Sequence, residues 1–384
     1  MKIMNKKICI LTSVHPAFDG RIFHKEAKSL TKAGYDVIII AQNDKNETVD
    51  GIQLIALKKA KNRIYRIFGF TFKIFLLALK QNADIYHFHD PELLPVGVLL
   101  KLFVGKKIIY DVHDNMRKQL LHRPWIPKWI RKSISIIYLI VESICLLFID
   151  FVIIAEDSYI ENYRGRNNIC AIKNFPILSY FLGNEEESFH KQEIIYSILI
   201  YIGSITKVRG IFELIKAIKV LKENGYNYVK LKLVGHFDSL SLLSEINKLL
   251  NSYNISNNVD IVGVISNDQI YKILSEAQVG LAILHPTYAQ IHPTKLFEYM
   301  VAGIPIIASN FPLWIKIVEG NKCGICVDPF KPEDIAKTIK YLIEHPKIRK
   351  EMGENGRKAI IEKYNWEKEA KKLLALYEVL LKNK

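Results

Sequence analysis

Short apolar segments recur along the first part of the chain, and stretches long enough for a helix separate them. A strand buried on both faces needs a nearly continuous apolar run, so this alternation is typical of a parallel sheet with helices on both sides. The segments that we interpret as strands are Ile8–Ser13, Val37–Ala41, Ile85–Phe88, Lys107–Tyr110 and Phe151–Ala155. The pattern predicts a doubly wound α/β domain over residues 1–182.

A polar, acidic segment over residues 183–193 interrupts this pattern and is typical of a linker between domains. The alternation then resumes with apolar runs at Ser197–Ile202, Lys230–Val234, Val259–Val262, Val279–Ile283, Pro305–Ala308 and Gly324–Val327. We therefore predict a second domain over residues 194–365, so that two Rossmann-like doubly wound domains face each other across a cleft. An amphipathic helix is expected over residues 366–381, and we expect it to pack back on the first domain.

The length and charge of the chain fit this organisation. A single hydrophobic core rarely grows beyond about 250–300 residues, and the chain has 384. Its net charge of +15 indicates an anionic partner such as a nucleotide, a nucleic acid or an acidic membrane surface. Residues 1–180 carry 27 Lys and Arg against 16 Asp and Glu, whereas the remainder carries 27 against 23, so the surplus lies in the first half. The cations form no nucleic-acid-binding motif, which disfavours nucleic acid as the partner.

The cysteines favour a protein of the reducing cytoplasm. They lack the spacing of a disulfide framework, and the N-terminus leads straight into a strand pattern without a signal peptide. Cys323 and Cys326 form a C-x-x-C pair, but neither a second pair nor a nearby histidine accompanies them, so we interpret them as structural residues and predict no metal site.

The loops that follow predicted strands carry the candidate chemistry, because ligands of such sheets bind at the carboxyl ends of the strands. Residues 12–21, after the first strand, contain no G-x-G-x-x-G, which disfavours a nicotinamide or flavin enzyme. The first loop of the second domain differs, because it combines a glycine turn with two cations ahead of a predicted helix. Its candidate anion-binding residues are Gly203, Ser204, Lys207, Arg209 and Gly210.

Two interpretations of this loop, the 203–210 turn, remain open. Backbone N–H groups and the helix N-terminus attract phosphate, and Lys207 or Arg209 would add a full charge. The alternative is a turn with a purely structural role. Further along, residues 293–305 (PTKLFEYMVAGIP) predict a helix that carries Lys295 and Glu298 and ends at Gly303.

The combination G-x-I-x-x-x-R-G at residues 203–210 and P-T-K-L-F-E-Y-M-x-A-G-I-P at residues 293–305 resembles family 4 of the retaining glycosyltransferases, which have the GT-B fold. Residues 15–23, 87–94 and 110–114 of the first half are similar to enzymes that assemble surface polysaccharides. The resemblance implies transfer of a sugar from a nucleotide-sugar donor to a saccharide or lipid-linked saccharide acceptor in bacterial cell-surface polysaccharide synthesis.

The resemblance also implies roles for individual residues. Glu298 would hold the ribose hydroxyls, and Arg209 would bind the diphosphate. His113 would touch the donor sugar, although a hydrogen-bonded loop histidine is the alternative. The remaining donor-side residues would be Gly20, which would let backbone amides approach the diphosphate, Gly263 and Val264 beside the base, and Lys295 as an extra cation near the phosphates. The acceptor-side residues would be Arg21, His89, Asp90 and Glu92.

Two positions depart from the family pattern. Gln290 stands where the family commonly has the first glutamate of a Glu, seven residues, Glu motif, and it supplies no negative charge to an oxocarbenium-like centre. Ser204 stands where an arginine often follows the glycine. We expect retention of anomeric configuration, with the leaving diphosphate stabilised by Arg209, Lys207 and helix N-termini and without a cofactor or an obligatory metal.

The basic surplus has a membrane interpretation. Lys59, Arg63, Arg66, Lys73 and Lys80 recur at helical spacing among apolar residues, and residues 125–148 begin with further cations and continue apolar. Acidic residues interrupt the second stretch, so a membrane span is disfavoured. We expect peripheral attachment to the inner face of the plasma membrane, with Arg63, Arg66, Lys73 and Lys80 facing anionic lipid. The alternative is a pair of core-packing helices with solvated basic edges.

Other functions remain open at this stage. An inverting transferase or a sugar-nucleotide epimerase would use the same fold. A non-catalytic module that binds a sugar nucleotide is also compatible with Gln290.

Overall fold

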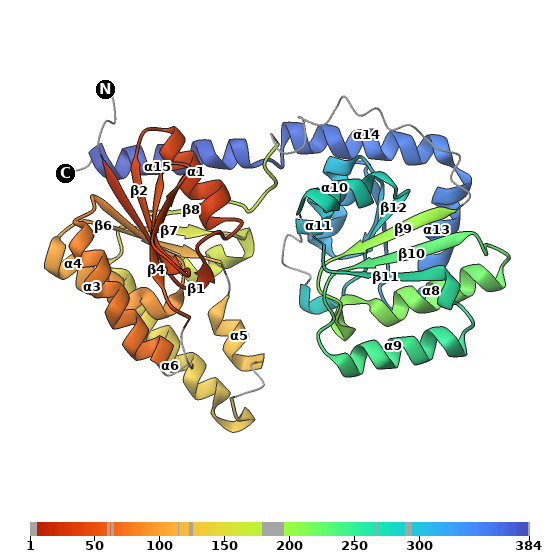
Figure 1. Cartoon of the computed structure of the whole chain (residues 1–384), viewed down its shortest axis with the longest axis horizontal. Coiled ribbons are helices and arrows are strands. Elements are labelled where there is room, and N and C mark those ends of the chain that lie inside the picture. Colours follow the sequence, from red (N-terminus) through yellow and green to blue (C-terminus); the bar gives the residue numbers. More distant parts are fainter. Residues whose placement is uncertain are drawn as a thin grey trace. The chain divides into compact units, whose positions relative to one another are not determined.

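The computed structural model describes residues 6–59, 62, 65–113, 115–122, 126–178, 196–265, 267–288 and 294–382. It divides into two compact units, one formed by residues 1–174 and 366–384 and the other by residues 175–365 (Figure 1). The C-terminal helix α15 (Trp366–Lys382) is therefore part of the first unit. Arg63, Gln290 and the linker predicted at residues 183–193 lie outside the described residues.

The first unit is built on an eight-stranded sheet with the order β3-β4-β2-β1-β5-β6-β7-β8. All neighbouring strands are parallel except the pair β3 and β4. The strands are β1 (Lys7–Pro16), β2 (Asp36–Gln42), β3 (Glu47–Val49), β4 (Ile52–Leu57), β5 (Ile85–Phe88), β6 (Lys107–Val112), β7 (Phe151–Ile154) and β8 (Ile169–Ala171). The five predicted strands are confirmed as β1, β2, β5, β6 and β7. The pattern missed β3, β4 and β8, which lie towards the sheet edges and lack a continuous buried run.

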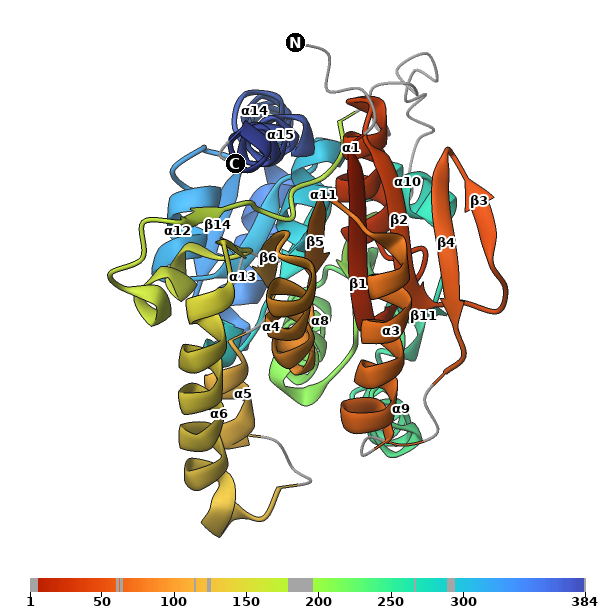
Figure 2. The ribbon, with the colours of Figure 1, turned by 90° about the vertical axis from the view of Figure 1, so that its left-hand side faces the viewer.

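Helices cover both faces of this sheet. One face carries α3 (Thr71–Gln81), α4 (Leu94–Val104) and α6 (Arg131–Cys145), and α5 (Met116–His122) packs on α6 (Figure 2). The other carries the helical turn Ile22–Ala27, α1 (Lys28–Lys32) and α15.

Alternation along the strands separates an apolar face from a polar one. Tyr86, Phe88 and Tyr110 belong to the hydrophobic core under α3, α4 and α6. Successive side chains of a strand point to opposite faces, so His87 and Asp111 point away from this core. The His87 side chain accordingly meets Tyr377 of α15.

The second unit contains a six-stranded parallel sheet with the order β11-β10-β9-β12-β13-β14. Its strands are β9 (Ser197–Ile202), β10 (Val229–Val234), β11 (Val259–Gly263), β12 (Val279–Ala282), β13 (Ile306–Ser309) and β14 (Gly324–Val327). All six predicted strands are confirmed. Each of these strands is followed, across a loop, by a helix that returns the chain to the start of the sheet.

Helices also cover both faces of the second sheet, which has one apolar cluster on each side. The first cluster is shared with α8 (Ile211–Glu223), α9 (Leu240–Ser252) and α13 (Pro332–Glu344). The second is shared with α10 (Asn267–Ser275), α11 (Thr294–Ala302), α12 (Pro312–Val318) and α14 (Pro346–Glu362). The sequence prediction of two Rossmann-like α/β units is confirmed.

Within the described ranges, no helix combines the length and the hydropathy that crossing a bilayer requires.

Candidate active site

The 203–210 turn follows β9 at the carboxyl end of the second sheet. Gly203 has a φ of 127° and Gly235, after β10, has a φ of 141°, both in the region that favours glycine. A β-carbon on Gly235 would lie 2.1 Å from the carbonyl oxygen of Gly203, so these two loops touch backbone to backbone. This close approach leaves no room for a side chain at Gly235 and holds the loops after β9 and β10 together.

Gly210 fixes the other end of the turn, where α8 begins. Its φ is 70°, and a β-carbon there would lie 2.2 Å from the carbonyl oxygen of Ile283, just after β12. Only glycine fits this contact. The N-terminus of α8, a helix of 13 residues, is thereby held at the carboxyl end of the sheet, where its dipole favours an anion.

Two cations flank Gly203. A β-carbon at Gly203 would lie 3.5 Å from Arg209 Nη1 and 3.6 Å from Lys295 Nζ. Lys295, from α11, is only 5% exposed, and its ammonium lies 3.7 Å from the centroid of the Tyr201 ring. Within the described part of the chain, Lys295 Nζ has no hydrogen-bond partner. An anion at Gly203 would supply one.

Burial and neighbouring charge act on Lys295 in the same direction. Desolvation lowers the pKa of Lys295 well below its usual value, the charge of Arg209 lowers it further, and Glu298 opposes both. Glu298 lies one helical turn after Lys295 on α11 and is partly exposed. The site thus has an excess of positive character that a bound anion would balance.

The other donor-side residues are placed as follows. Lys207 is exposed and forms an ion pair of 2.8 Å with Glu245 of α9, so part of its charge is already neutralised. The carbonyl oxygen of Ser204 accepts a hydrogen bond from Tyr201 Oη at 2.9 Å. Gly263 has a φ of 82° at the end of β11, and the neighbouring Val264 is strongly exposed.

In the first unit, Asp90 organises the carboxyl-terminal part of β1. Asp90 Oδ2 accepts hydrogen bonds from the hydroxyl of Thr12 at 2.8 Å and from the backbone N–H of Ser13 at 2.6 Å. Glu92 accepts from the hydroxyl of Ser13 at 2.8 Å and pairs with Arg66, whose Nε lies 2.8 Å from Glu92 Oε1. These carboxylates fix the ends of β1 and β5 relative to each other.

The loop that contains Gly20 has a different anchor. Asp19 Oδ1 accepts hydrogen bonds from the backbone N–H groups of Arg21 and Ile22 at 2.8 and 2.9 Å. Burial would raise the pKa of Asp19, but its hydrogen bonds from His15 and from these backbone groups outweigh burial and lower it. Gly20 is exposed, and a β-carbon there would meet nothing within 4 Å. The chain leaves open space at Gly20, which is compatible with the approach of a ligand.

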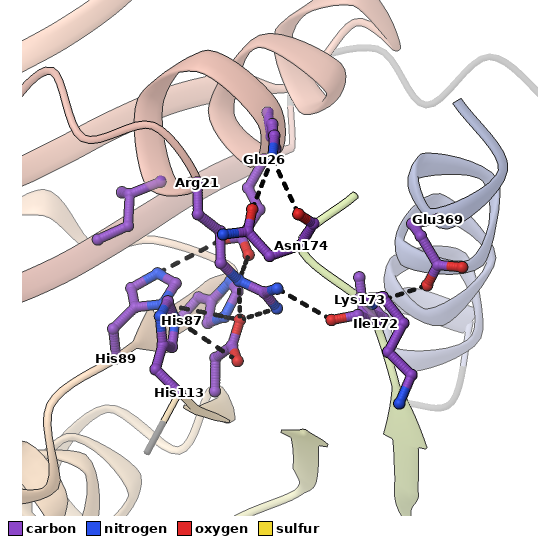
Figure 3. A network of polar contacts seen from close by, with 12 residues as sticks. Arg21, Glu26, His87, His89, His113, Ile172, Lys173, Asn174 and Glu369 are labelled. Atoms are coloured by element: carbon purple, nitrogen blue, oxygen red, sulfur yellow. Dashed lines mark hydrogen bonds and ion pairs between the residues drawn. The ribbon is translucent and has the colours of Figure 1, made fainter. Parts of the chain in front are cut away.

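Five buried polar side chains lie beneath this loop, and we call them the buried cluster: Arg21, Glu26, His87, His89 and Asp111 (Figure 3). The Arg21 guanidinium holds them together. Its Nη2 lies 2.8 Å from Asp111 Oδ2, its Nε lies 2.8 Å from Glu26 Oε1, and its Nη1 donates to the carbonyl of Ile172 at 2.9 Å. Burial lowers the pKa values of both histidines, which are therefore neutral.

His113 connects the buried cluster to the surface. It follows β6 and is one-fifth exposed, and its Nε2 lies 2.7 Å from Nδ1 of the buried His89. On the far side of the cluster, His87 Nδ1 lies 2.7 Å from Tyr377 Oη of α15. A continuous path of polar contacts therefore runs from α15 to a partly exposed histidine.

The residue types of the buried cluster include metal ligands. Ligand atoms of Glu26, His87, His89 and Asp111 all lie within 4.8 Å of one another. The guanidinium of Arg21, however, contacts an oxygen of each carboxylate at 2.8 Å. A cation already occupies the lone pairs that a metal would need, so this set does not fit a metal site and we assign none to it.

Three of the four residues predicted to lie on the acceptor side are buried in the first unit. Arg21, His89 and Asp90 are buried, and their polar groups bind other parts of the protein. Their role towards an acceptor stays a prediction. Arg66, predicted to face a membrane, is likewise paired with Glu92.

Sequence reasoning did not select five residues that the structure brings into these sites: Glu26, His87, Asp111, Tyr201 and Tyr377. One signal was available for two of them. His87 and Asp111 interrupt otherwise apolar strands, and His89 and Asp111 continue the same register on neighbouring parallel strands. Polar residues at alternate positions of adjacent buried strands indicate a polar patch on one face.

Comparison with known proteins relates both units to one class. Residues 184–359 match the family Glycosyl transferases group 1, and residues 20–155 match Glycosyltransferase Family 4. The chain is 23% identical to the capsular polysaccharide biosynthesis glycosyltransferase CapM of Staphylococcus aureus, over 98% of each protein.

Solved structures show the same fold. Sucrose-phosphate synthase from Thermosynechococcus elongatus has a TM-score of 0.76 at 19% identity, covering 99% of this chain and 100% of that one. HepE of Anabaena in complex with UDP-glucose has a TM-score of 0.72 at 14% identity, covering 97% of this chain and 99% of that one.

Proposed function

Because the chain belongs to the group 1 and family 4 glycosyltransferases and has the GT-B fold, we propose that it is a retaining enzyme that uses a nucleotide-sugar donor. The acceptor is a saccharide or lipid-linked saccharide of a cell-surface polysaccharide. The name of CapM, a capsular polysaccharide enzyme, and the UDP-glucose bound to HepE support these substrate classes.

The ammonium of Lys295, which has no hydrogen-bond partner among the described residues, lies beside Gly203 and carries the proposal. A nucleoside diphosphate at the 203–210 turn would accept hydrogen bonds from backbone N–H groups at the start of α8. The positive charges of Arg209 and Lys295 would neutralise part of its negative charge. A buried ammonium without a partner is costly, and a diphosphate oxygen removes that cost. Glu298, one turn further along α11, would accept the ribose hydroxyls.

The transfer step then depends on stabilising the leaving group. The bond between the anomeric carbon and the diphosphate breaks, and a new bond forms to the acceptor oxygen on the same face. The proton of the acceptor hydroxyl passes to a diphosphate oxygen. Arg209, Lys295 and the N-terminus of α8 stabilise the negative charge that develops on the diphosphate, and His113 contacts the sugar. We expect no obligatory metal or other cofactor, so activity should survive treatment with a chelator.

A donor screen tests this function. UDP-, GDP-, ADP- and CMP-sugars are compared by thermal shift and then by turnover with a saccharide acceptor, because a ligand of the folded state raises the apparent stability. We expect one nucleotide to stabilise the protein and its sugar to appear in the product with retained anomeric configuration by NMR. An inverted product would refute retention, donor interconversion without an acceptor would indicate an epimerase, and binding without turnover would indicate a binding module.

We also propose that the first unit attaches peripherally to the inner face of the plasma membrane, which places the enzyme in the cytoplasm. Helices α3, α4 and α6 lie side by side (Figure 2). They and the short turns next to α6 expose many large apolar side chains. We call this the three-helix face: Phe72, Leu76, Leu79, Leu99, Leu102, Phe103, Ile136, Ile137, Ile140 and Ile144, with Trp129 at 84% exposure and Leu147 at 80%.

Exposed cations accompany this apolar surface. Lys73 and Lys80 lie on α3, Lys128 lies in the helical turn Lys128–Ile130 just before α6, and Lys132 lies in the first turn of α6. Apolar patches of this extent are uncommon on monomeric proteins, and cations next to them favour an anionic lipid surface. This arrangement supports membrane attachment through apolar contact, with the basic residues in a secondary role.

A further inference from the structure

Glu26 presents its two carboxyl oxygens to two different partners. Oε1 lies 2.8 Å from Arg21 Nε, and Oε2 lies 3.4 Å from His89 Nε2 (Figure 3). A carboxylic acid has one oxygen that only accepts and one that donates. Within the described residues, neither Glu26 oxygen nor His89 Nε2 makes a hydrogen bond when the glutamate is taken as ionised. A hydrogen on Oε2 would supply the donor that this pair lacks, because a neutral imidazole nitrogen can accept it.

The charge balance of the buried cluster points the same way. Two carboxyl groups, Glu26 and Asp111, share the single guanidinium of Arg21, and both are fully buried. Both neighbouring histidines are neutral, so two carboxylates would leave a net negative charge in the interior. An uncompensated buried charge is strongly unfavourable, so one carboxyl group takes up a proton.

Asp111 is the group that stays ionised. Its Oδ2 receives two hydrogen bonds from Arg21, from Nη2 at 2.8 Å and from Nε at 3.3 Å. Burial would raise the pKa of Asp111, but Arg21, His113 and His87 outweigh burial and lower it well below the usual range. Burial raises the pKa of Glu26 well above its usual value. The charge of Arg21 lowers this pKa and the charge of Asp111 raises it, so that the net change is upward.

We propose that Glu26 is a neutral carboxylic acid that donates its hydrogen to His89 and thereby fixes His113 as the tautomer with hydrogen on Nδ1. The donor-to-acceptor direction of the first hydrogen bond, from Glu26 to His89, sets the direction of the next one, from His89 to His113. Glu26 Oε2–H donates to His89 Nε2, so the hydrogen of His89 lies on Nδ1 and is donated to His113 Nε2 across 2.7 Å. His113 then carries its own hydrogen on Nδ1.

The tautomer decides what His113 offers to a ligand. With hydrogen on Nδ1, the ring donates to an oxygen lone pair of a sugar hydroxyl or of a diphosphate. With the reverse direction, Nδ1 would accept a hydrogen and would repel a diphosphate oxygen. This consequence rests on the proposed function, whereas the tautomer itself does not. Glu26 is accordingly a positioning residue that acts through His89.

The other groups around the path are compatible with this direction. His113 Nε2 lies 3.6 Å from Asp111 Oδ1, beyond hydrogen-bond distance, and the rings of His15 and His113 are 5.7 Å apart. His87 is occupied separately. Its Nδ1 faces the hydroxyl of Tyr377, a neutral donor because burial raises its pKa, and its Nε2 faces Asp111 Oδ2 at 3.7 Å.

Histidine ring-nitrogen NMR of the full chain, labelled with ¹⁵N at its histidines and without substrate, tests the proposal. The signals of His113 are assigned by comparison with His113→Gln. We expect wild type to show hydrogen on Nδ1. Glu26→Gln should show the same tautomer, because its amide oxygen can accept from Arg21 while its amide N–H donates to His89.

Two further variants make the test decisive. Glu26→Leu removes the donor and should give His113 a mixture of tautomers in a protein whose circular dichroism is unchanged. Glu142→Gln is the matched control, because Glu142 is a buried glutamate of the same unit that pairs with Arg117 and lies outside the path. It should leave the His113 signals unaltered.

Hydrogen on Nε2 of His113 in wild type, or a change of tautomer in Glu26→Gln, would overturn the proposal, since either result means that Glu26 is an ionised acceptor. Equal His113 signals in wild type and Glu26→Leu would also overturn it. These readouts need no turnover. If the donor screen failed while the tautomer pattern held, only the proposed function would fall.

Discussion

Lys295 Nζ lies 3.7 Å from the centroid of the Tyr201 ring and has no hydrogen-bond partner within the described residues. Lys295 comes from α11 and Tyr201 from β9, the strand that leads into the 203–210 turn, so the ring holds the ammonium beside Gly203. The aromatic face partly compensates for the lost hydration of the ammonium. The free protein thus keeps the Lys295 amine in place beside Gly203 before any anion arrives.

Donor binding should become tighter as the pH falls, with uptake of a proton at Lys295. Desolvation and Arg209 lower the pKa of Lys295 in the free protein, and a bound diphosphate would raise it. The complex therefore holds more protons than the free protein between these two values. Calorimetry of nucleoside-diphosphate binding in two buffers of different ionisation enthalpy measures the uptake. Lys295→Met should abolish the uptake, and an unchanged value in this variant would assign the proton elsewhere.

Arg209 should contribute more than Lys207 to diphosphate affinity. Arg209 flanks Gly203, whereas Lys207 is paired with Glu245. Arg209→Ala should weaken binding of the nucleoside diphosphate by about 1.5–3 kcal/mol, the usual size of a lost charged hydrogen bond, and should reduce the rate as well. Lys207→Ala serves as the matched control with a small effect. Equal losses in both variants, by calorimetry, would contradict the proposed site.

Glu298→Gln should weaken donor binding and slow turnover. An ionised carboxylate can accept a hydrogen bond from each of the two ribose hydroxyls. Replacing it by an amide should lower the binding free energy by about 1.5–3 kcal/mol, the usual contribution of a charged hydrogen bond. Donor KM and kcat are the measurements. Comparison with the 2′-deoxy donor sharpens the test, since the variant and wild type should differ little on that substrate. Kinetics identical to wild type on the ordinary donor would remove Glu298 from the site.

His113→Ala should lower kcat strongly while the protein stays folded. The His113 side chain is partly exposed and its ring makes one short contact, with His89, so its removal leaves the buried cluster beneath largely packed. Steady-state kinetics and thermal melting distinguish the two roles of this residue. A large fall in melting temperature with little change in kcat would favour the structural alternative.

The sequence predicted most of the fold, because the strands of both sheets are buried on two faces and leave continuous apolar runs such as Ile85–Phe88 and Ser197–Ile202. It also predicted the 203–210 turn, whose glycines, cations and helix start are adjacent in the chain. It could not predict which charges are already paired. Lys207 forms an ion pair with Glu245, and Arg66 forms one with Glu92. The spacing of these residues along the sequence does not indicate either contact.

The buried cluster could not be predicted either, because its contacts join residues that are distant in the sequence. His87 and Tyr377 are 290 positions apart in the chain and meet only because α15 returns to the first unit. Glu26 lies on a helical turn where a charged residue is ordinarily solvated. Its burial follows from the packing of that turn against the sheet and α15, which is a property of the tertiary structure.

Membrane attachment should depend on the three-helix face more than on the basic edge of α3. Each cation near an anionic surface contributes about 1 kcal/mol, and its effect decays over a Debye length of roughly 8–10 Å. Arg66 is paired with Glu92, so Lys73 and Lys80 are the exposed charges of α3 to remove. The double variant Lys73→Gln with Lys80→Gln should bind anionic vesicles less at low salt and show a weaker salt dependence.

Trp129→Ser with Ile137→Ser should lose binding at every salt concentration, because burial of their apolar area does not depend on screening.

Co-sedimentation with vesicles of mixed phosphatidylglycerol and phosphatidylcholine measures both effects. Leu240→Ser is the matched control, since Leu240 is 85% exposed but belongs to the second unit; it should sediment like wild type. Donor binding should be intact in every variant, because the 203–210 turn and α11 lie in the second unit. Wild type that stays in the supernatant at low salt would refute attachment. A dimer in light scattering that Trp129→Ser with Ile137→Ser converts to a monomer would instead assign the three-helix face to a second copy of the chain.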